Sequence, residues 1–260
     1  MEQRLIYDSV EICYNGRPAV RDISFSLCPG EILGIVGESG SGKSTLIRAA
    51  LRILGQGGMV TKGDIWFAGQ NLPEVPERRM RLIRGAKIGM IFQDAGDSLC
   101  PVRTIGDQIY ESLAAHEKLN RQESDRRAGE LLASLGFSDS KRILESYPFE
   151  LSGGMKQRVG AAMAMLPNPS VLLADEPTSA LDVTVQKQMV EEMLLFRRRY
   201  GTSIILVTHN IGVVSAMADT VLVLREGEAV EYGEAEKVLR EPREAYTREL
   251  LLAAPRLRRK

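Results

Sequence analysis

One glycine-rich segment constrains the fold of this chain more than any other. It reads Gly37-Glu38-Ser39-Gly40-Ser41-Gly42-Lys43-Ser44-Thr45 and fits the pattern G-x-x-x-x-G-K-[ST]. A short apolar run typical of a buried parallel strand, Ile32–Val36, precedes it, and helical spacing begins at Ser44. The order of strand, loop and helix predicts a phosphate-binding loop, because backbone N–H groups would face phosphates at the positive end of the helix.

The two side chains that follow the last glycine carry the chemistry of such a loop. We expect Lys43 to reach the β- and γ-phosphates of a nucleotide and the Ser44 hydroxyl to ligate Mg²⁺. The competing interpretation is a flexible glycine turn, which does not require the full pattern between a strand and a helix. The loop predicts nucleotide binding and leaves the reaction open.

Two acids end a second buried strand. The apolar run Val171-Leu172-Leu173-Ala174 leads into Asp175 and Glu176, and open α/β sheets hold ligands at the carboxyl ends of their strands. Asp175 can hold Mg²⁺ through water, and Glu176 can polarise an attacking water, since phosphoryl transfer depends on positioning and electrostatics. An isolated pair of this kind is more often a helix cap. After a phosphate loop it predicts a hydrolytic site.

Two further polar side chains follow strand-like runs. Gln93 comes after Gly89–Phe92, where a helical pattern begins, so its amide can reach Mg²⁺ and the water. His209 closes the buried strand expected at Ile204–Val207. A lone histidine is more often structural, but the only other one, His116, lies in a polar helical stretch. We expect Gln93 and His209 at the same sheet edge as Glu176.

Hydrophobic periodicity predicts an α/β fold with a helical insert. Apolar and polar residues alternate in Leu5–Tyr14 and Val20–Leu27, which indicates half-buried antiparallel strands. Helical spacing fills residues 94–167, with helices expected at Ile105–Leu113, Arg121–Leu135 and Gly153–Leu166. Buried strands then return, and Val221–Tyr232 is typical of a hairpin turning at Arg225-Glu226-Gly227.

The bulk properties exclude several classes of protein. Lysine plus arginine equals aspartate plus glutamate at 34 each, so charge gives no indication of a nucleic-acid partner. Cys13, Cys28 and Cys100 are scattered, which argues against a disulfide framework or zinc site and suits a reducing cytosol. No run approaches about 18 apolar residues and the N-terminus lacks a signal-peptide pattern. The basic end, Arg256–Lys260, is expected to be a solvated tail.

The segment Leu151-Ser152-Gly153-Gly154-Met155-Lys156-Gln157 narrows the class further. With the phosphate loop before it and the acidic strand end after it, it resembles the signature of the ATP-binding cassette (ABC) superfamily. The resemblance extends to Tyr14 as the aromatic loop, Gln93 as the Q-loop, Ser179-Ala180-Leu181-Asp182 as the D-loop and His209 as the switch histidine. It covers essentially all 260 positions.

The resemblance implies a P-loop NTPase core of mainly parallel sheet with helices, an antiparallel β subdomain and an α-helical insert. It implies one domain over residues 1–260, with the core at about 1–92 and 168–235, the insert at about 93–167 and a short tail at 236–260. The implied ligands are ATP and Mg²⁺, and the implied reaction is ATP hydrolysis coupled to transport across a membrane.

Site residues follow from the same resemblance. The implied catalytic residues are Glu176, His209, Gln93 and Lys43, and the implied metal ligands are Ser44, Gln93 and Asp175. Tyr14 would stack on adenine through its flat ring, although an aromatic at a turn can also be a plain surface residue. The other nucleotide contacts implied are Gly37, Ser39, Gly40, Gly42, Lys43, Ser44, Thr45, Gln93, Ser152, Gly153, Gly154 and Asp182. In the family two cassettes stack head to tail, so Ser152 and Gly154 of one chain would complete the γ-phosphate site of another.

Finer details are similar to the peptide/nickel-type importer ATPases. They are Met90-Ile91-Phe92-Gln93-Asp94, Ser98-Leu99 with Pro101, Ser179–Gln186 and Tyr246-Thr247-Arg248-Glu249-Leu250-Leu251. Ala95 stands where the family usually has proline, in a loop that faces the permease. The chain stops at Lys260 without the cysteine-rich extension that peptide-importing members often carry. The short form therefore fits a nickel or metal-chelate importer at least as well as an oligopeptide or dipeptide importer.

The resemblance also implies partners and a location. They are integral membrane permease subunits, a second ABC ATPase (a sibling heterodimer, with a homodimer as the other arrangement) and, indirectly, a solute-binding protein. The chain would act at the cytoplasmic face of the cell membrane as a peripheral subunit of bacterial or archaeal type. Two alternatives stay open: an exporter ATPase, which shares every catalytic residue, and a soluble ABC protein outside transport, which usually carries tandem cassettes, coiled coils or zinc sites.

Overall fold

Short parallel strands with almost every residue buried form the centre of this computed structural model, which describes residues 4–179 and 181–253. They belong to a six-stranded sheet in the order β10-β9-β3-β8-β7-β6, in which β9 and β10 pair antiparallel and the other neighbours pair parallel. The strands are β3 (Ile32–Val36), β6 (Ile88–Ile91), β7 (Val171–Asp175), β8 (Ser203–Val207), β9 (Thr220–Arg225) and β10 (Glu228–Glu234). The predicted buried strands and the hairpin are confirmed.

Both faces of this sheet are covered, which explains why its strands are apolar throughout. Successive side chains of a strand point to opposite faces. Leu33 and Ile35 join a cluster that includes α1 (Lys43–Ala50), whereas Ile32 and Val36 join the cluster on the other face. Because each strand must fill two cores, polar residues have no place in its middle.

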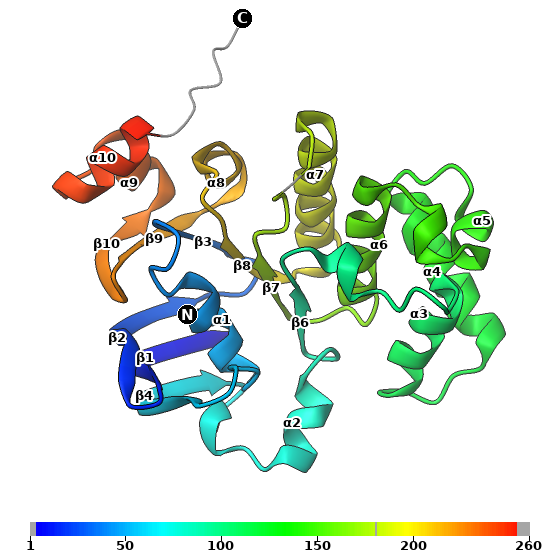
Figure 1. Ribbon diagram of the computed structural model, residues 1–260, viewed down its shortest axis with the longest axis horizontal. Helices are drawn as coiled ribbons and strands as arrows, with labels where there is room; N and C mark the ends of the chain where they lie inside the picture. The colour runs from blue at the N-terminus through cyan, green and yellow to red at the C-terminus, as the bar shows by residue number, and fades with distance from the viewer. Residues whose placement is uncertain (1–3, 180, 254–260) are drawn as a thin grey trace, which may run out of the picture.

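A second sheet of four antiparallel strands, β2-β1-β4-β5, packs against α1 and appears in blue and cyan in Figure 1. β1 pairs with β2 from Leu5 opposite Leu27 to Tyr14 opposite Arg17, which confirms the predicted pair. Periodicity does not reveal β4, because only Ile65 and Phe67 of this strand are buried. The elements of this region are β1 (Leu5–Tyr14), β2 (Arg17–Leu27), β4 (Gly58–Phe67), β5 (Gln70–Asn71), the 3-10 turn η1 (Leu72–Glu74) and α2 (Glu77–Ile83).

The α-helical insert lies between β6 and β7, in green in Figure 1. Its three predicted helices agree with the structure to within one residue. Short helices and turns fill the gaps between them, where the sequence is too short for clear periodicity. The insert comprises η2 (Ala95–Ser98), α3 (Ile105–Ala114), α4 (Arg121–Ser134), α5 (Ser140–Glu145), η3 (Pro148–Glu150) and α6 (Gly153–Met165).

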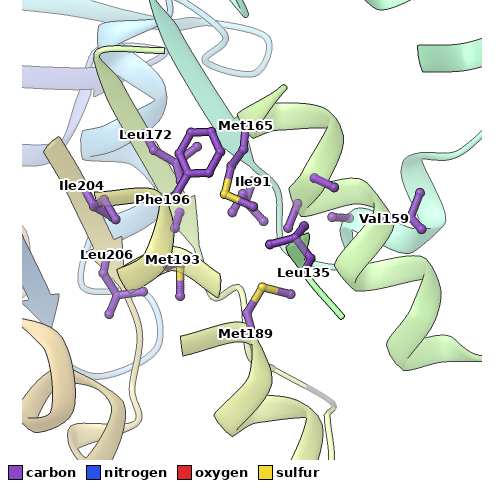
Figure 2. Close-up of a cluster of buried hydrophobic side chains, with 14 of the residues drawn as sticks. Ile91, Leu135, Val159, Met165, Leu172, Met189, Met193, Phe196, Ile204 and Leu206 are labelled. Carbon is purple, nitrogen blue, oxygen red and sulfur yellow. The ribbon is translucent and has the colours of Figure 1, made fainter. Parts of the chain in front are cut away.

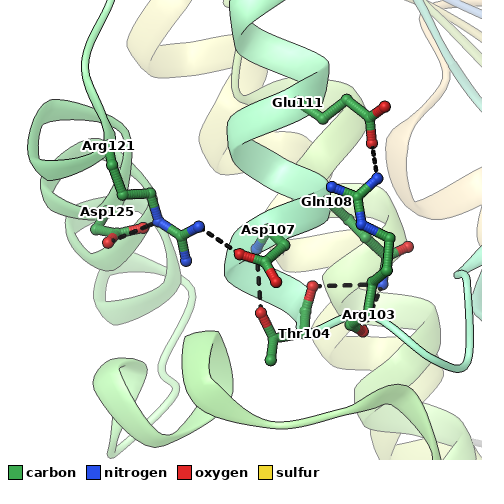
Figure 3. Close-up of polar contacts among 7 residues, drawn as sticks. All are labelled: Arg103, Thr104, Asp107, Gln108, Glu111, Arg121 and Asp125. Atoms are coloured by element: carbon green, nitrogen blue, oxygen red, sulfur yellow. Dashed lines mark hydrogen bonds and ion pairs between the residues drawn. The ribbon is translucent and has the colours of Figure 1, made fainter.

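Polar contacts at the outer side of the insert orient α3 and α4 (Figure 3). Thr104 caps α3 by accepting a hydrogen bond from the Asp107 N–H at 3.2 Å. The Asp107 carboxylate pairs with Arg121 at the start of α4, and this guanidinium holds the pKa of Asp107 below its usual value. Arg121 also pairs with Asp125 one turn later. These side chains are substantially exposed, so their pairs set geometry more than stability.

Apolar packing, with three methionines prominent, joins the insert to the sheet (Figure 2). Met165 of α6 lies in one cluster with Met193 and Phe196 of α7 (Val183–Tyr200) and with strand residues of β7 and β8. Arg158 of α6 and Glu192 of α7 form an ion pair in the same interface, with side chains 11% and 5% exposed. The helix α6 begins within the signature segment, and we call it the signature helix. It is attached to α7 by both apolar packing and a buried ion pair.

The last third of the chain returns to the core. α8 (Ile211–Met217) precedes the β9–β10 hairpin, and two helices follow it, α9 (Ala235–Arg240) and α10 (Ala245–Ala253). Residues 236–253, expected as a plain tail, thus include most of α9 and all of α10. The basic end Arg256–Lys260 lies outside the described residues. Among the described helices none is long and apolar enough to cross a membrane.

Candidate functional site

The glycine loop between β3 and α1 adopts a conformation that side chains would prevent. Gly37 has φ 154° and Gly42 has φ 96°, both in the region that favours glycine. A Cβ on Gly37 would lie 2.1 Å from the Leu224 carbonyl oxygen, and one on Gly42 would lie 2.9 Å from the Val20 side chain. The loop is pressed between β2 and the end of β9, with its N–H groups at the start of α1.

Lys43 is the first residue of α1 and folds back over the loop. Its ammonium donates to the carbonyl oxygens of Gly37 at 2.9 Å and Glu38 at 2.7 Å. Burial lowers the pKa of Lys43, and the nearby carboxylates of Glu176 and Asp175 oppose this effect. The lysine thus forms a fixed positive charge at the edge of the glycine loop.

Asp175 at the end of β7 is fully buried and bonded to two residues of α1. Its Oδ1 accepts from the Ser44 hydroxyl at 2.6 Å, and its Oδ2 accepts from the Arg48 guanidinium at 2.9 Å. Residues four apart lie on one face of a helix, so α1 presents both donors to the same carboxylate. A hydroxyl beside a carboxylate is a donor set that suits Mg²⁺.

Glu176 and His209 meet at the carboxyl ends of neighbouring strands. Glu176 Oε1 lies 2.9 Å from His209 Nδ1, and the Glu176 N–H donates to the Val207 carbonyl at 2.8 Å. The Glu176 backbone has φ 47°, in the left-handed region that is strained for residues other than glycine. The side chain of His209 is 71% exposed and that of Glu176 13%, so the acid lies beneath the histidine.

One cavity of 730 Å³ collects most of the predicted site residues. This volume lies within the range of small-molecule sites. Gln93 borders it from the segment after β6, and Ser179, which sequence reasoning placed only in the D-loop, borders it beyond Glu176. The full lining is Pro18, Ala19, Ser39, Gly40, Gly42, Lys43, Ser44, Thr45, Gln93, Glu176, Ser179, His209 and Glu226.

Tyr14 is not part of this lining. It ends β1 opposite Arg17, and a Cβ on Gly58 would lie 2.6 Å from its ring. Pro18 and Ala19, which follow its partner Arg17 in β2, border the cavity instead. The proposed adenine-stacking role of Tyr14 therefore stays a prediction.

The signature segment also lies away from the cavity. Ser152 caps α6, accepting a hydrogen bond from the Met155 N–H at 3.3 Å, and Ser152 and Gly153 are exposed. Asp182 caps α7 by accepting from the Thr184 and Val185 N–H groups at 2.9 and 3.0 Å. Ser152, Gly153, Gly154 and Asp182 do not line the cavity, and Ala180 of the D-loop lies outside the described residues.

Gln157 connects three of the motifs, a role that the sequence motif alone does not reveal. Its side chain is buried; Oε1 accepts from the Gly96 N–H at 3.1 Å and Nε2 donates to the Pro177 carbonyl at 3.2 Å. Gly96 follows Gln93, and Pro177 follows Glu176. Ala95 packs closely on α6, because a Cβ added to Gly160 of that helix would lie 2.9 Å from the Cβ of Ala95. The helix α6 is therefore hydrogen-bonded to the segment that follows Gln93 and to the segment that follows Glu176.

Comparison with known proteins agrees with this geometry. The family model described as "ABC transporter" matches residues 20–179. The chain is 44% identical over 92% of its length to the oligopeptide transport ATP-binding protein OppD of Bacillus subtilis, of which it covers 67%. It is 45% identical over 92% of its length to the glutathione import ATP-binding protein GsiA of Escherichia coli K12 and spans 39% of that relative.

Solved structures show the same fold. CbiO1 of Clostridium perfringens, described as part of the ABC transporter complex CbiONQ, aligns with a TM-score of 0.79 and 27% identity over 93% of this chain and 92% of its own. The ATP-binding cassette MJ0796, solved as a dimer in a post-hydrolysis state with ADP and phosphate, aligns with a TM-score of 0.78 and 26% identity over 89% of this chain and 98% of its own. With a phosphate loop, an acidic strand end and a signature helix in one fold, this chain belongs to the ABC transporter family and is an ATPase of that family.

Proposed function

We propose that this chain is the ATP-hydrolysing subunit of a peptide importer and works with Mg²⁺, two permease subunits and a second ABC ATPase. The observation that carries the proposal is the convergence of Lys43, Ser44, Gln93, Glu176 and His209 on one cavity. An ammonium, a hydroxyl, an amide, a carboxylate and an imidazole gathered at the carboxyl edge of a parallel sheet are groups suited to bind a triphosphate and activate water.

Each residue has a distinct task in this proposal. Lys43 would contact the β- and γ-phosphates from its place at the loop edge. Ser44 and Asp175, already in contact at 2.6 Å, would hold the metal with Gln93; bound Mg²⁺ would neutralise charge that develops on the phosphates.

Hydrolysis would be the task of the acid and the histidine. Glu176 would orient and polarise the attacking water, and His209, bonded to it at 2.9 Å, would fix its carboxylate and contact the γ-phosphate. Because His209 is exposed and Glu176 is beneath it, closing of the site by a partner would exclude bulk solvent from both.

A second ATPase subunit would complete the site. Ser152 and Gly153 are exposed at the N-terminus of α6, where the helix dipole favours a phosphate, yet they do not border the chain's own cavity. Head-to-tail stacking would place them over the cavity of another cassette. A sibling cassette is the proposed partner, with a homodimer as the other arrangement. Asp182 would lie between the two sites.

A groove at the junction of core and insert offers a place for the permease. A cavity of 290 Å³ is bordered by Leu51 and Phe92 from the core and by Leu99 and Met163 from the insert. Phe92 is 42% exposed and precedes Gln93. A permease segment seated here would push on the Q-loop and on α6 together, through Gln157.

The proposed cargo is a peptide. The relatives at 44 and 45% identity are named for oligopeptides and glutathione, which is itself a tripeptide. Neither name supports the nickel alternative. Delivery by a solute-binding protein and a position at the cytoplasmic face of the membrane belong to the same proposal.

ATP-dependent association tests the proposal. Size-exclusion chromatography of Glu176→Gln, alone and mixed with the sibling ATPase, should show a dimer only when ATP is present, since blocked hydrolysis preserves the sandwiched nucleotide. A wild-type chain that stays monomeric with ATP and still hydrolyses it at the full transporter rate would contradict the shared site. Uptake of labelled peptides by the reconstituted importer, with chelated nickel as the competing cargo, tests the substrate.

A further inference from the structure

The helix that follows the β9–β10 hairpin returns to the phosphate loop. Tyr246, in the first turn of α10, is buried, and its hydroxyl oxygen accepts a hydrogen bond from the Glu38 N–H at 3.2 Å. Glu38 is the second residue of the glycine loop. The segment that the family model matches ends at residue 179, and Tyr246 lies beyond it.

α10 is fixed in position before it reaches the loop. The Glu231 carboxylate of β10 accepts hydrogen bonds from the Arg243 N–H at 2.9 Å and the Glu244 N–H at 3.3 Å, just ahead of the helix. The Arg225 guanidinium, at the end of β9, lies 4.9 Å from the centre of the Tyr246 ring, within the range of a cation–π contact. The chain is thus bonded to β10 just before the tyrosine, and a guanidinium lies over the tyrosine ring.

The hairpin turn makes a second contact with the same loop. The Gly227 N–H donates to the Ser41 carbonyl at 3.1 Å. The loop is therefore bonded at Glu38 and at Ser41, on both sides of Gly40. Tyr246 and Gly227 together form what we name the C-terminal brace.

The brace acts on the residue that holds the lysine. Glu38 donates its N–H to Tyr246 and accepts from the Lys43 ammonium with its carbonyl oxygen, at 3.2 and 2.7 Å. The Glu38 N–H and the Gly37 carbonyl belong to one planar peptide unit, so fixing the N–H also fixes the Gly37 carbonyl, which accepts from the Lys43 ammonium at 2.9 Å. A glycine loop has many accessible conformations, so an external bond reduces the entropy that nucleotide binding must remove.

We propose that Tyr246 is a positioning residue of the nucleotide site, which holds the phosphate loop and Lys43 in the conformation that binds ATP. The inference rests on the proposed nucleotide site and adds to it a residue that does not border the cavity. Tyr246 acts through Glu38 and touches no phosphate itself.

The test compares Tyr246→Phe with Tyr232→Phe in the full chain. Both changes remove one hydroxyl that is bonded to backbone; Tyr232 bonds to the Ser26 carbonyl at 3.4 Å, away from the loop. Tyr246→Phe should weaken binding of a fluorescent ATP analogue about fivefold, the effect of one hydrogen bond. It should raise KM for ATP by the same factor and leave kcat near the wild-type value. Tyr232→Phe should change neither.

Amide hydrogen exchange supplies a readout that a general loss of stability would not move. The peptide covering Gly37–Lys43 should exchange faster in Tyr246→Phe, whereas peptides of the buried strands β7 and β8 should be unchanged. If Tyr246→Phe fails to fold, Arg225→Gln is the second variant, because it removes the charge over the tyrosine ring and keeps the hydroxyl. It should also weaken binding of the ATP analogue and speed exchange in the loop, by about half as much.

Equal affinity and equal exchange in Tyr246→Phe and Tyr232→Phe would overturn the proposal. So would faster exchange in the strands to the same extent as in the loop, because it would indicate plain destabilisation. Failure of the wild-type chain to bind the analogue at all would instead contradict the proposed nucleotide site, and the two failures are therefore distinguishable.

Discussion

The phosphate loop and the signature segment are built alike and placed differently. Each places glycines at the N-terminus of a helix, just before α1 in one case and in the first turn of α6 in the other. Gly37 and Gly42 of the phosphate loop pack closely on β9 and β2, and its lysine is 7% exposed. Ser152 and Gly153 of the signature are exposed and border none of the cavity that the loop forms.

The difference shows which half of the reaction a single chain can perform. A helix N-terminus attracts phosphate wherever it lies, but of these two segments only the phosphate loop borders a cavity that is also lined by a hydroxyl, a carboxylate and the loop's own lysine. The signature has the dipole and the donors without these partners. Binding is therefore expected of the isolated chain, and rapid hydrolysis of an assembly in which a second signature covers the cavity.

Of the substitutions considered, Glu176→Gln should have the largest effect, and it should separate ATP turnover from ATP binding. It keeps the loop and Lys43, so affinity for ATP should be retained, but the water loses its carboxylate and turnover should fall about 10²- to 10⁴-fold. Steady-state phosphate release in the presence of the partner subunits measures the loss, and titration with a fluorescent ATP analogue measures the retained affinity. Near-normal turnover would remove Glu176 from its assigned role.

Lys43→Ala should weaken the binding of ATP. Loss of charge-assisted hydrogen bonds to the phosphates should weaken affinity about ten- to a hundredfold. The matched control is Lys62→Ala, since Lys62 is a surface lysine 72% exposed and paired only with Glu11 among the described residues. Unchanged affinity in Lys43→Ala would mean that the loop is not the phosphate site.

Ser152→Ala should separate the two regions directly. Binding of the analogue to the isolated chain should be unchanged, whereas ATP turnover by the assembled pair should fall about tenfold because one donor to the γ-phosphate is lost. Ser152→Asp keeps the cap of α6 but repels phosphate, so it should lose at least as much turnover without loss of helix stability. Reduced analogue binding by the isolated Ser152→Ala chain would show that its signature serves its own site.

The smallest effect concerns the attachment of the signature helix. Burial raises the pKa of Glu192 to about 7, against the attraction of Arg158. The folded chain then binds this proton more tightly than the unfolded chain, so the contribution to stability is complete below the ordinary carboxyl pKa and is lost as pH rises through about 7.

Urea unfolding at pH 5.5 and 8.0 measures this contribution. The free energy of unfolding of the wild type should fall by about 1–3 kcal/mol more over this interval than that of Glu192→Gln, which cannot titrate. This comparison uses only the change in the free energy of unfolding between the two pH values. It is therefore independent of the stability that the variant loses at every pH because Arg158 is unpaired. Equal slopes would mean that Glu192 stays charged in the ion pair throughout.

The sequence predicts those helices and strands whose hydrophobic pattern continues over several residues. Buried strands and the helices of the insert each repeat one pattern over several residues, and the structure places them within one residue or so of the expected bounds. β4 escapes prediction because only two of its residues, Ile65 and Phe67, are buried, which is too few to set a clear pattern. The helices α9 and α10 are short, and their few buried residues, such as Val238 and Tyr246, give little periodicity.

The candidate site divides in the same way. Motif residues that follow strand ends, such as Glu176 and His209, converge because parallel strands end at one edge. Residues that act through long-range bonds have no such signal: Arg48, Gln157 and Tyr246 contact partners 127, 61 and 208 positions away. Arg48 alone could be anticipated, from its place one turn after Ser44.

The left-handed backbone at Glu176 sets two demands on one position. Glycine or asparagine would adopt φ 47° with less strain, so either should relax the turn after β7, yet neither supplies a carboxylate. Selection for a robust fold and selection for turnover therefore favour different residues here. A deep mutational scan read once for abundance and once for transport should rank the substitutions of Glu176 in opposite orders. Such a reversal would support the proposed catalytic role of the Glu176 carboxylate without any assay of ATP.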